Sequence, residues 1–184
     1  MQIINSTHSY GIVAIFLHWL LAITFIALFA LGFWMVDLDY YSTWYHDAPW
    51  IHKSLGVLAV SLMLIRLLWK FFNAQPHGLD KPILNKVAQG VHHLFYLLII
   101  LIGLSGYLIS TAEGDAISVF GWFDVPALLP VFEGQADMAG DIHKWLAYGL
   151  IGFVVLHTLA ALKHHFKDKD KTLTRMLWPL KTRE

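Results

Sequence analysis

Two histidines, His143 and His157, lie fourteen residues apart in the last long apolar stretch of the sequence. At about 100° and about 1.5 Å per residue, this spacing places both imidazoles on one face of a helix, about 21 Å apart along its axis. A helix that crosses a hydrocarbon layer of about 30 Å would hold one of them near each membrane surface. Because ionisable or coordinating side chains inside a membrane are costly, two on one face predict a pair of stacked metal centres.

The elements that must position these histidines are four apolar stretches, at residues 11–36, 51–72, 87–110 and 140–162. Each is long enough to span a membrane, and irregular backbone is not tolerated in lipid, so each is expected to be a helix. The first is about twice as long as a signal-peptide core and is expected to be retained. The sequence therefore predicts an all-α fold, an integral membrane four-helix bundle in a single domain over residues 1–184.

Composition narrows the function further. With 57% apolar and 14% charged residues, the 184-residue chain is too apolar for a water-soluble domain. A net charge of zero leaves no basic face for nucleic acid. The absence of cysteine excludes disulfides, thiolate iron–sulfur ligation and covalent haem attachment. Any haem would be held by axial ligands and packing.

Lys and Arg residues indicate the orientation of the chain. They lie at or between spans two and three and after span four, the latter group including Lys181 and Arg183, whereas the loops 37–50 and 111–141 contain none. By the positive-inside rule, both chain ends are cytoplasmic and these two loops face the other side.

This orientation gives each histidine a depth. His18 and His157 fall near the inner surface, and His52 and His143 near the outer one. Facing neutral imidazoles at equal depth are what bis-histidine ligation of two b-type haems in a four-helix bundle requires. A single membrane histidine is more often a hydrogen-bonded interior residue, but that alternative does not account for two matched layers.

The other histidines are expected to have lesser roles. His93, and to a smaller extent His92, competes with His18 for the inner iron, and both are expected to pack or hydrogen-bond near it. His164 and His165 follow span four and are expected at the surface. His8, His46 and His77 lie in loops and indicate nothing.

Basic residues near these layers supply further candidates. Arg66 follows His52 by fourteen residues, so it shares that face at the inner depth, where haem propionates could pair with it. Snorkelling to the surface is the alternative. Lys53 and Lys144 directly follow the outer histidines on an acidic face. They could neutralise propionates, attract an anion or merely snorkel.

Two further features could serve the site or ordinary packing. Small residues recur in the spans, where they usually permit close helix approach and could also admit a flat macrocycle; they are Gly56, Gly103, Ser105, Gly106, Gly149 and Gly152. The apolar, aromatic run 117–129 in the outer loop is predicted either as an interfacial lid or as a packed loop.

Several segments together resemble the bacterial cytochrome b561 family, over nearly the whole chain. They are Leu17-His18-Trp19, Ile51-His52-Lys53-Ser54-Leu55-Gly56, the loop from Ile117 to Phe123, Ile142-His143-Lys144, Leu156-His157 and Leu162-Lys163-His164-His165-Phe166. The resemblance implies an inner-membrane cytochrome with two haems b, and His18, His52, His143 and His157 as axial ligands. One branch of that family is a superoxide oxidase that passes electrons from superoxide to ubiquinone. The family is also similar to the cytochrome b subunits of hydrogenases and formate dehydrogenases, which need partner proteins.

The leading hypothesis is a multi-pass protein of the bacterial inner membrane that oxidises superoxide at the periplasmic face and reduces ubiquinone in the bilayer. Lys53 and Lys144 are its candidate catalytic residues, and a monomer is expected. The alternative is a cytochrome b carrier or subunit that links the quinone pool to a partner dehydrogenase. A non-redox protein whose histidines bind another metal or sense protons is the third hypothesis. Transport is disfavoured because no span contains an internal acid or a broken helix.

Overall fold

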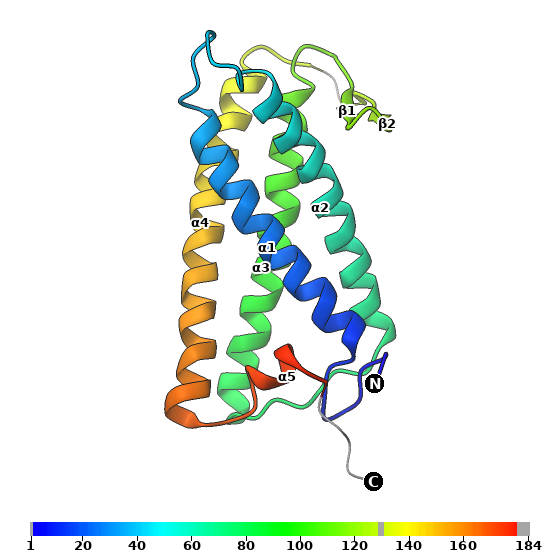
Figure 1. Ribbon diagram of the computed structural model, residues 1–184, viewed down its shortest axis with the longest axis vertical. Coiled ribbons are helices and arrows are strands. Elements are labelled where there is room, and N and C mark those ends of the chain that lie inside the picture. Colours follow the sequence, from blue (N-terminus) through cyan, green and yellow to red (C-terminus); the bar gives the residue numbers. More distant parts are fainter. Residues whose placement is uncertain (1, 129–130, 180–184) are drawn as a thin grey trace. The chain divides into compact units, whose positions relative to one another are not determined.

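The computed structural model describes residues 2–128 and 131–179, so Leu129 of the predicted lid and the basic residues Lys181 and Arg183 lie outside the described residues. Four long helices dominate the described chain: α1 (Ile12–Met35), α2 (Asp47–Phe72), α3 (Pro82–Ser110) and α4 (Gln135–Lys163) (Figure 1). All four are long and apolar enough to cross a membrane. The prediction of four spanning helices is confirmed.

Three of these helices begin about five residues before the predicted spans. α2 starts at Asp47 and α3 at Pro82, whereas the predicted spans began at residues 51 and 87. α4 starts at Gln135, directly after Gly134 with its positive φ of 73°. An acidic residue or proline in a first helical turn is favourable because the N–H groups there have no partner within the helix. Hydropathy marks only the membrane-spanning part of a helix, so it misses these polar first turns.

The chain forms two compact units, and each long helix contributes a part to both. The first unit comprises Met1–Ala22, Leu62–Tyr96 and Gly152–Glu184, and the second comprises Ile23–Ser61 and Leu97–Ile151. His18, His157 and Arg66 belong to the first unit, whereas His52 and His143 belong to the second.

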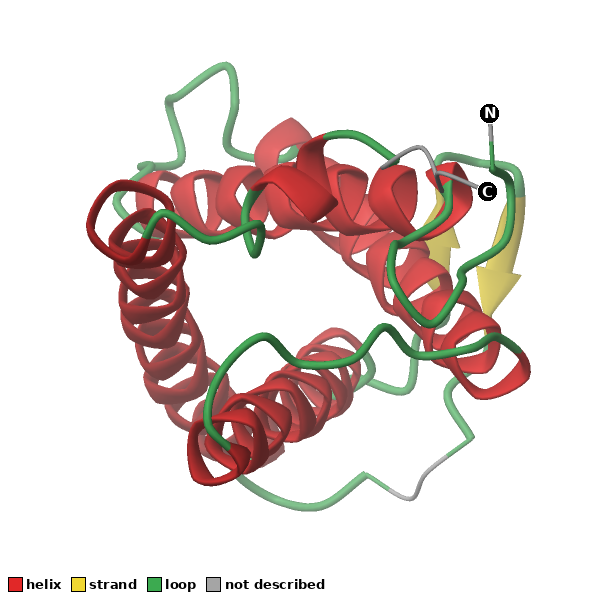
Figure 2. Cartoon of the chain, turned by 90° about the horizontal axis from the view of Figure 1, so that it is seen from below, coloured by secondary structure: helices red, strands yellow, loops and turns green. Residues whose placement is uncertain are grey.

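Within the second unit, the predicted lid contains a short β-hairpin, an exception to the all-α expectation. β1 (Ile117–Val119) pairs antiparallel with β2 (Phe123–Val125), and the two strands are the yellow arrows in Figure 2. Three residues, Phe120, Gly121 and Trp122, connect the paired residues Val119 and Phe123. Phe120 and Gly121 have positive φ values of 50° and 69°, as the central residues of a type I′ turn require, and the Trp122 N–H donates to the Val119 carbonyl at 2.9 Å.

The hairpin is attached to α2 through one side chain. Ser54 is completely buried, and its Oγ accepts a hydrogen bond from the Phe120 N–H at 3.1 Å and donates one to the Ser118 carbonyl at 3.4 Å. Val119 is buried as well, whereas Trp122 is 73% exposed. The run is therefore packed at the strand and presents an aromatic side chain outward at the turn, so it combines features of both predicted alternatives.

Within the first unit, the segment after α4 folds back onto the start of the chain. A π-helical turn, η1 (His164–Asp168), leads to the four-residue helix α5 (Thr174–Leu177). Trp19 Nε1 donates to the Met176 carbonyl at 2.6 Å, and Arg175 donates to the His77 carbonyl at 2.8 Å. The C-terminal segment is therefore tied to α1 and to the loop between α2 and α3.

Candidate metal centres

The structure brings His52 of α2 and His143 of α4 together in the second unit. Their ring centroids are 6.2 Å apart with an interplanar angle of 72°. A metal-bound imidazole nitrogen lies about 2.0–2.1 Å from the metal and its ring centre about 1.1 Å further, so two ligands on opposite sides of one ion have centroids about 6.3 Å apart. The spacing of this pair therefore fits a single iron between the two rings.

His18 of α1 and His157 of α4 form the equivalent pair in the first unit. Their centroids are 6.4 Å apart at an interplanar angle of 70°, nearly the geometry of the other pair. All four histidines are partly buried in apolar helices. Two separate bis-histidine arrangements are thus present, with α4 contributing one imidazole to each.

His157 has a second imidazole beside it. The His92 ring lies 5.9 Å from the His157 ring at 67°, whereas His93 makes no ring contact within the described part of the chain. This reverses the order expected from the sequence, in which His93 was the stronger competitor. His18 remains the more enclosed of the two rings that face His157, because His92 is exposed.

The hydrogen bonds of the paired histidines leave coordinating nitrogens free. His143 Nδ1 lies 3.0 Å from the Ile102 carbonyl and 3.1 Å from Ser105 Oγ, which leaves Nε2 available for a metal. A hydrogen bond on the far nitrogen fixes the tautomer and orientation of a ligating histidine. Among the described residues, His18 Nδ1 is buried without a hydrogen-bond partner, whereas the His52 ring lies within hydrogen-bonding reach of the Leu28 backbone.

The contact of Ser105 with a candidate ligand was not predicted from the sequence. Ser105 was considered only as a small packing residue, yet it is 4% exposed and its hydroxyl also donates to the Ile102 carbonyl at 3.0 Å. The available indication was a hydroxyl in an apolar span one helix away from a candidate ligand.

Two glycines lie against the imidazole rings of the His52–His143 pair, where a larger side chain would crowd the rings. A Cβ atom on Gly32 would lie 3.0 Å from His52 Cε1, and one on Gly106 would lie 3.2 Å from His143 Cε1. Gly32 was not singled out from the sequence, since nothing in its spacing reveals which ring it faces.

The other small residues divide between the two predicted roles. A Cβ on Gly103 would lie 2.8 Å from a methyl group of Val60, so this glycine does permit close helix approach. In contrast, a Cβ on Gly56, Gly149 or Gly152 would meet no atom within 4 Å. For these three positions, the interpretation as close helix contacts is wrong.

The candidate basic residues lie in two different environments. Arg66 is partly buried and lies within electrostatic range of His18 and His157. Lys53 and Lys144 are both exposed, beside the two histidines of the other pair. Within residues 2–128 and 131–179, none of the three has an ion-pair partner within 4.0 Å.

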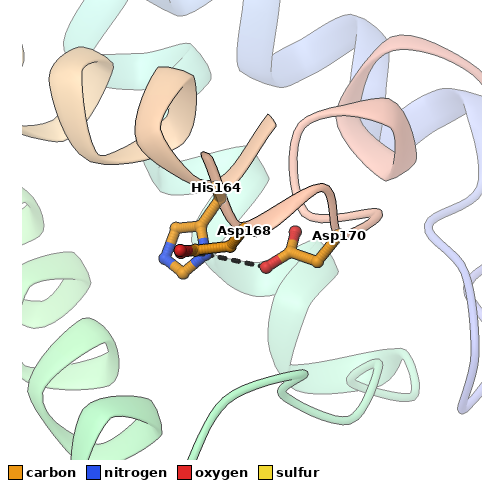
Figure 3. A group of neighbouring side chains, drawn as sticks. All are labelled: His164, Asp168 and Asp170. Atoms are coloured by element: carbon orange, nitrogen blue, oxygen red, sulfur yellow. Dashed lines mark hydrogen bonds and ion pairs between the residues drawn. The ribbon is translucent and has the colours of Figure 1, made fainter. Parts of the chain in front are cut away.

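His164 is not the free surface residue that the sequence suggested. Its Nδ1 lies 2.7 Å from Asp170 Oδ2 and 3.2 Å from Asp168 Oδ2, and its Nε2 lies 3.3 Å from Asp80 Oδ2. Figure 3 shows His164 and the two aspartates of the C-terminal segment. Lys163 also pairs with Asp168 at 2.7 Å. Because the His164 nitrogens and the Lys163 ammonium already contact these carboxylates, the cluster is a polar network that anchors the C-terminal segment to the loop between α2 and α3.

Comparisons with known proteins indicate one family. Residues 9–179 match the family described as prokaryotic cytochrome b561. The chain is 50% identical over 179 residues to cytochrome b561 homolog 2 of Escherichia coli, covering 96% of this chain and 95% of the relative. It is 34% identical over 134 residues to the Yersinia pestis protein named "Probable superoxide oxidase CybB", covering 70% of this chain and 76% of that one. It is also 28% identical over 169 residues to cytochrome b561 homolog 1 of Escherichia coli.

Proposed function

Since the chain belongs to the prokaryotic cytochrome b561 family, whose members are membrane electron-transfer proteins that bind haem b, we propose that it holds two haems between its two histidine pairs. His52 and His143 hold one haem, and His18 and His157 hold the other. The protein is a multi-pass inner-membrane oxidoreductase, and we further propose that both termini are cytoplasmic and that Lys53 and Lys144 face the periplasm.

The observation that carries this proposal is the spacing of the rings within apolar helices. Two independent pairs, at 6.2 Å and 6.4 Å, match the separation of two imidazoles on opposite sides of one iron. The distance alone is not distinctive, because the rings of His8 and His77, which lie in loops, are also 6.3 Å apart. What sets the two proposed pairs apart is that all four imidazoles are partly buried in long apolar helices, with α4 contributing one to each pair. In each pair, imidazole is the only type of metal ligand that the described residues supply. A haem held by two imidazoles suits one-electron transfer.

Haem content tests the ligand assignment directly. The purified wild-type chain is expected to contain two haems, and His143→Ala or His157→Ala is expected to lose one of them. His92→Ala is the matched control, because it removes an imidazole that also faces His157 and yet should leave both haems in place. Two haems in every histidine variant, with unaltered absorption, would contradict the assignment.

For the reaction, we propose superoxide as the electron donor and ubiquinone as the acceptor. Two superoxide anions each give up one electron and become dioxygen, and one ubiquinone takes both electrons and two protons to become ubiquinol. The haems supply the one-electron relay when bound. Support comes from the relative named as a superoxide oxidase and from the exposed cations Lys53 and Lys144, which have no ion-pair partner in the described part of the chain and would attract an anion.

The attraction can be measured with pulses of superoxide under anaerobic conditions. Lys53→Glu and Lys144→Glu are each expected to slow haem reduction, with a larger effect at low ionic strength, because exposed charges are screened by salt. Lys86→Glu is the control, since it changes an exposed lysine at the start of α3, on the predicted cytoplasmic side. Equal rates of haem reduction in all variants would contradict the proposal that Lys53 and Lys144 attract superoxide. No reduction at all, together with co-purification of a second subunit, would favour a cytochrome b carrier for a dehydrogenase.

A further inference from the structure

A group of three cations and two phenols lies in the first unit, outside the histidine pairs. Arg66 and Lys70 come from α2, Arg175 from α5, Tyr96 from α3, and Tyr10 from the segment before α1. Lys70 Nζ lies 5.2 Å from the centre of the Tyr96 ring and is within electrostatic range of Arg66. Side chains from four separate parts of the chain therefore converge on one region.

Tyr10 connects the two arginines. It is within electrostatic range of both Arg175 and Arg66, and Arg66 is in turn within range of Tyr96. Burial raises the pKa of the Tyr10 phenol, although the two arginines act in the opposite direction. Tyr10 is thus a neutral hydroxyl group, whose oxygen could accept a hydrogen bond from a guanidinium group.

Among residues 2–128 and 131–179, no carboxylate pairs with these cations. The ion pairs of the described residues involve Lys163 and His164 with Asp80, Asp168 and Asp170, and none involves Arg66, Lys70 or Arg175. One guanidinium nitrogen of Arg175 donates a hydrogen bond to the His77 carbonyl, whereas its buried Nε has no partner within the described chain. Partly buried cations without an anion are costly, so this arrangement favours the binding of an anion that the described residues do not supply.

We propose that Arg66, Lys70 and Arg175 form an anion site that holds the two propionate carboxylates of the haem bound by His18 and His157. The proposal rests on the proposed haem content. Arg66 is the link, because it is within electrostatic range of both histidines as well as of Tyr10. Guanidinium groups pair with carboxylates through two parallel hydrogen bonds, which suits Arg66 and Arg175 better than it suits a point charge.

This assignment gives the C-terminal segment a function. α5 delivers Arg175, and the hydrogen bonds from Trp19 to Met176 and from Arg175 to His77 hold α5 in place. The segment is therefore a clasp over the propionate edge of one haem. Cations beside the propionates favour the reduced haem, whose charge is one unit less positive, so they raise its reduction potential.

The experiment measures the reduction potentials of both haems in the purified holoprotein. Arg175→Gln is expected to lower the potential of only one haem, the one that His18→Ala removes. Arg175→Lys should restore most of the shift, because it keeps the charge. Lys171→Gln is the matched control: this exposed lysine lies four residues earlier in the same segment, and its loss should leave both potentials unchanged.

Reconstitution with haem dimethyl ester, which lacks the propionate charges, separates the possible anions. With this haem, which offers no carboxylate to a guanidinium group, wild type and Arg175→Gln should retain the haem at His18 and His157 equally well, whereas with natural haem the variant should lose it more readily. A difference in retention that persists with the ester would assign the cations to another anion, such as a lipid phosphate, and would overturn the proposal, as would an unchanged potential in Arg175→Gln with natural haem. A wild-type chain with one haem that still responds as expected would retract the two-haem proposal and keep this one.

Discussion

Replacing Gly32 by alanine tests whether the position of the His52 ring is set by metal coordination. The added Cβ would lie 3.0 Å from His52 Cε1 and 3.5 Å from Nδ1. This contact is tighter than nine in ten Cβ contacts in proteins, so the ring has to give by a few tenths of an ångström. Metal–ligand distances hold within about 0.2 Å, so a ring fixed by coordination cannot yield freely and the metal bond is strained.

The alanine should not unfold the chain, because in a helix interior alanine is favoured over glycine by about 0.8–1.0 kcal/mol. Gly32→Ala is therefore expected to remain folded in the membrane and to lose one haem or convert it to a high-spin form, as seen in its visible and electron paramagnetic resonance spectra. Gly149→Ala is the matched control, since its Cβ would meet nothing within 4 Å and this glycine lies about 240° from the face of His143. Two low-spin haems with unchanged spectra in Gly32→Ala would refute the placement of iron at His52.

Two other changes test the space around the haem and the anchoring of the C-terminal segment. Gly56 follows His52 by one helical turn, so it lies on nearly the same face, and a Cβ there would meet no atom within 4 Å. Gly56→Leu should therefore exclude one haem, as a pyridine haemochrome assay would show. Gly149 lies about 240° from the face of His143, so Gly149→Leu should retain both haems in the same assay. Burial raises the pKa of Asp170, but hydrogen bonds from Thr172 and from His164 together hold it below the ordinary value. The ionised Asp170 carboxylate therefore stabilises the C-terminal segment above its unfolded pKa of about 3.9, and this stabilisation is lost as the pH falls through the lower folded pKa. Amide hydrogen exchange in residues 164–178 should accelerate only in that acidic range. Asp170→Asn should show fast exchange at neutral pH, and slow exchange in that variant would count against the network.

The helices and the four paired histidines could be predicted because both depend on periodicity. Hydropathy identified four spans, and the fourteen-residue spacing of His143 and His157 required one face and two depths. Depth then matched each with the correct partner, as the two short centroid distances show. What spacing could not predict was the rotation of each helix about its axis. His92 rather than His93 faces His157 for that reason, since neighbouring residues differ by about 100°.

Residues that act through another residue were also beyond the sequence. Ser105 and Gly32 matter because of the atoms they meet on a different helix, and nothing in their own segments indicates those neighbours. The same holds for His164, whose partners include Asp80, more than eighty residues earlier in the chain. The sequence shows the chemical type of each of these residues, but it does not show which distant residue lies beside it in the fold.

The surroundings of the two histidine pairs predict the order of their haem potentials. His143 can donate from Nδ1 to the Ile102 carbonyl and to Ser105 Oγ, which makes the imidazole a stronger donor to iron and favours the oxidised haem. Arg66, within electrostatic range of His18, favours the reduced haem.

The His52–His143 haem should therefore have the lower potential, and electrons should pass from it to the His18–His157 haem, the direction that superoxide oxidation beside Lys53 requires. Ser105→Ala should raise the lower potential and leave the higher one in place, with Ser105→Thr restoring it. If redox titration of His18→Ala showed that the lower-potential haem had been lost, the order of the two centres and the inferred direction of electron transfer would both be wrong.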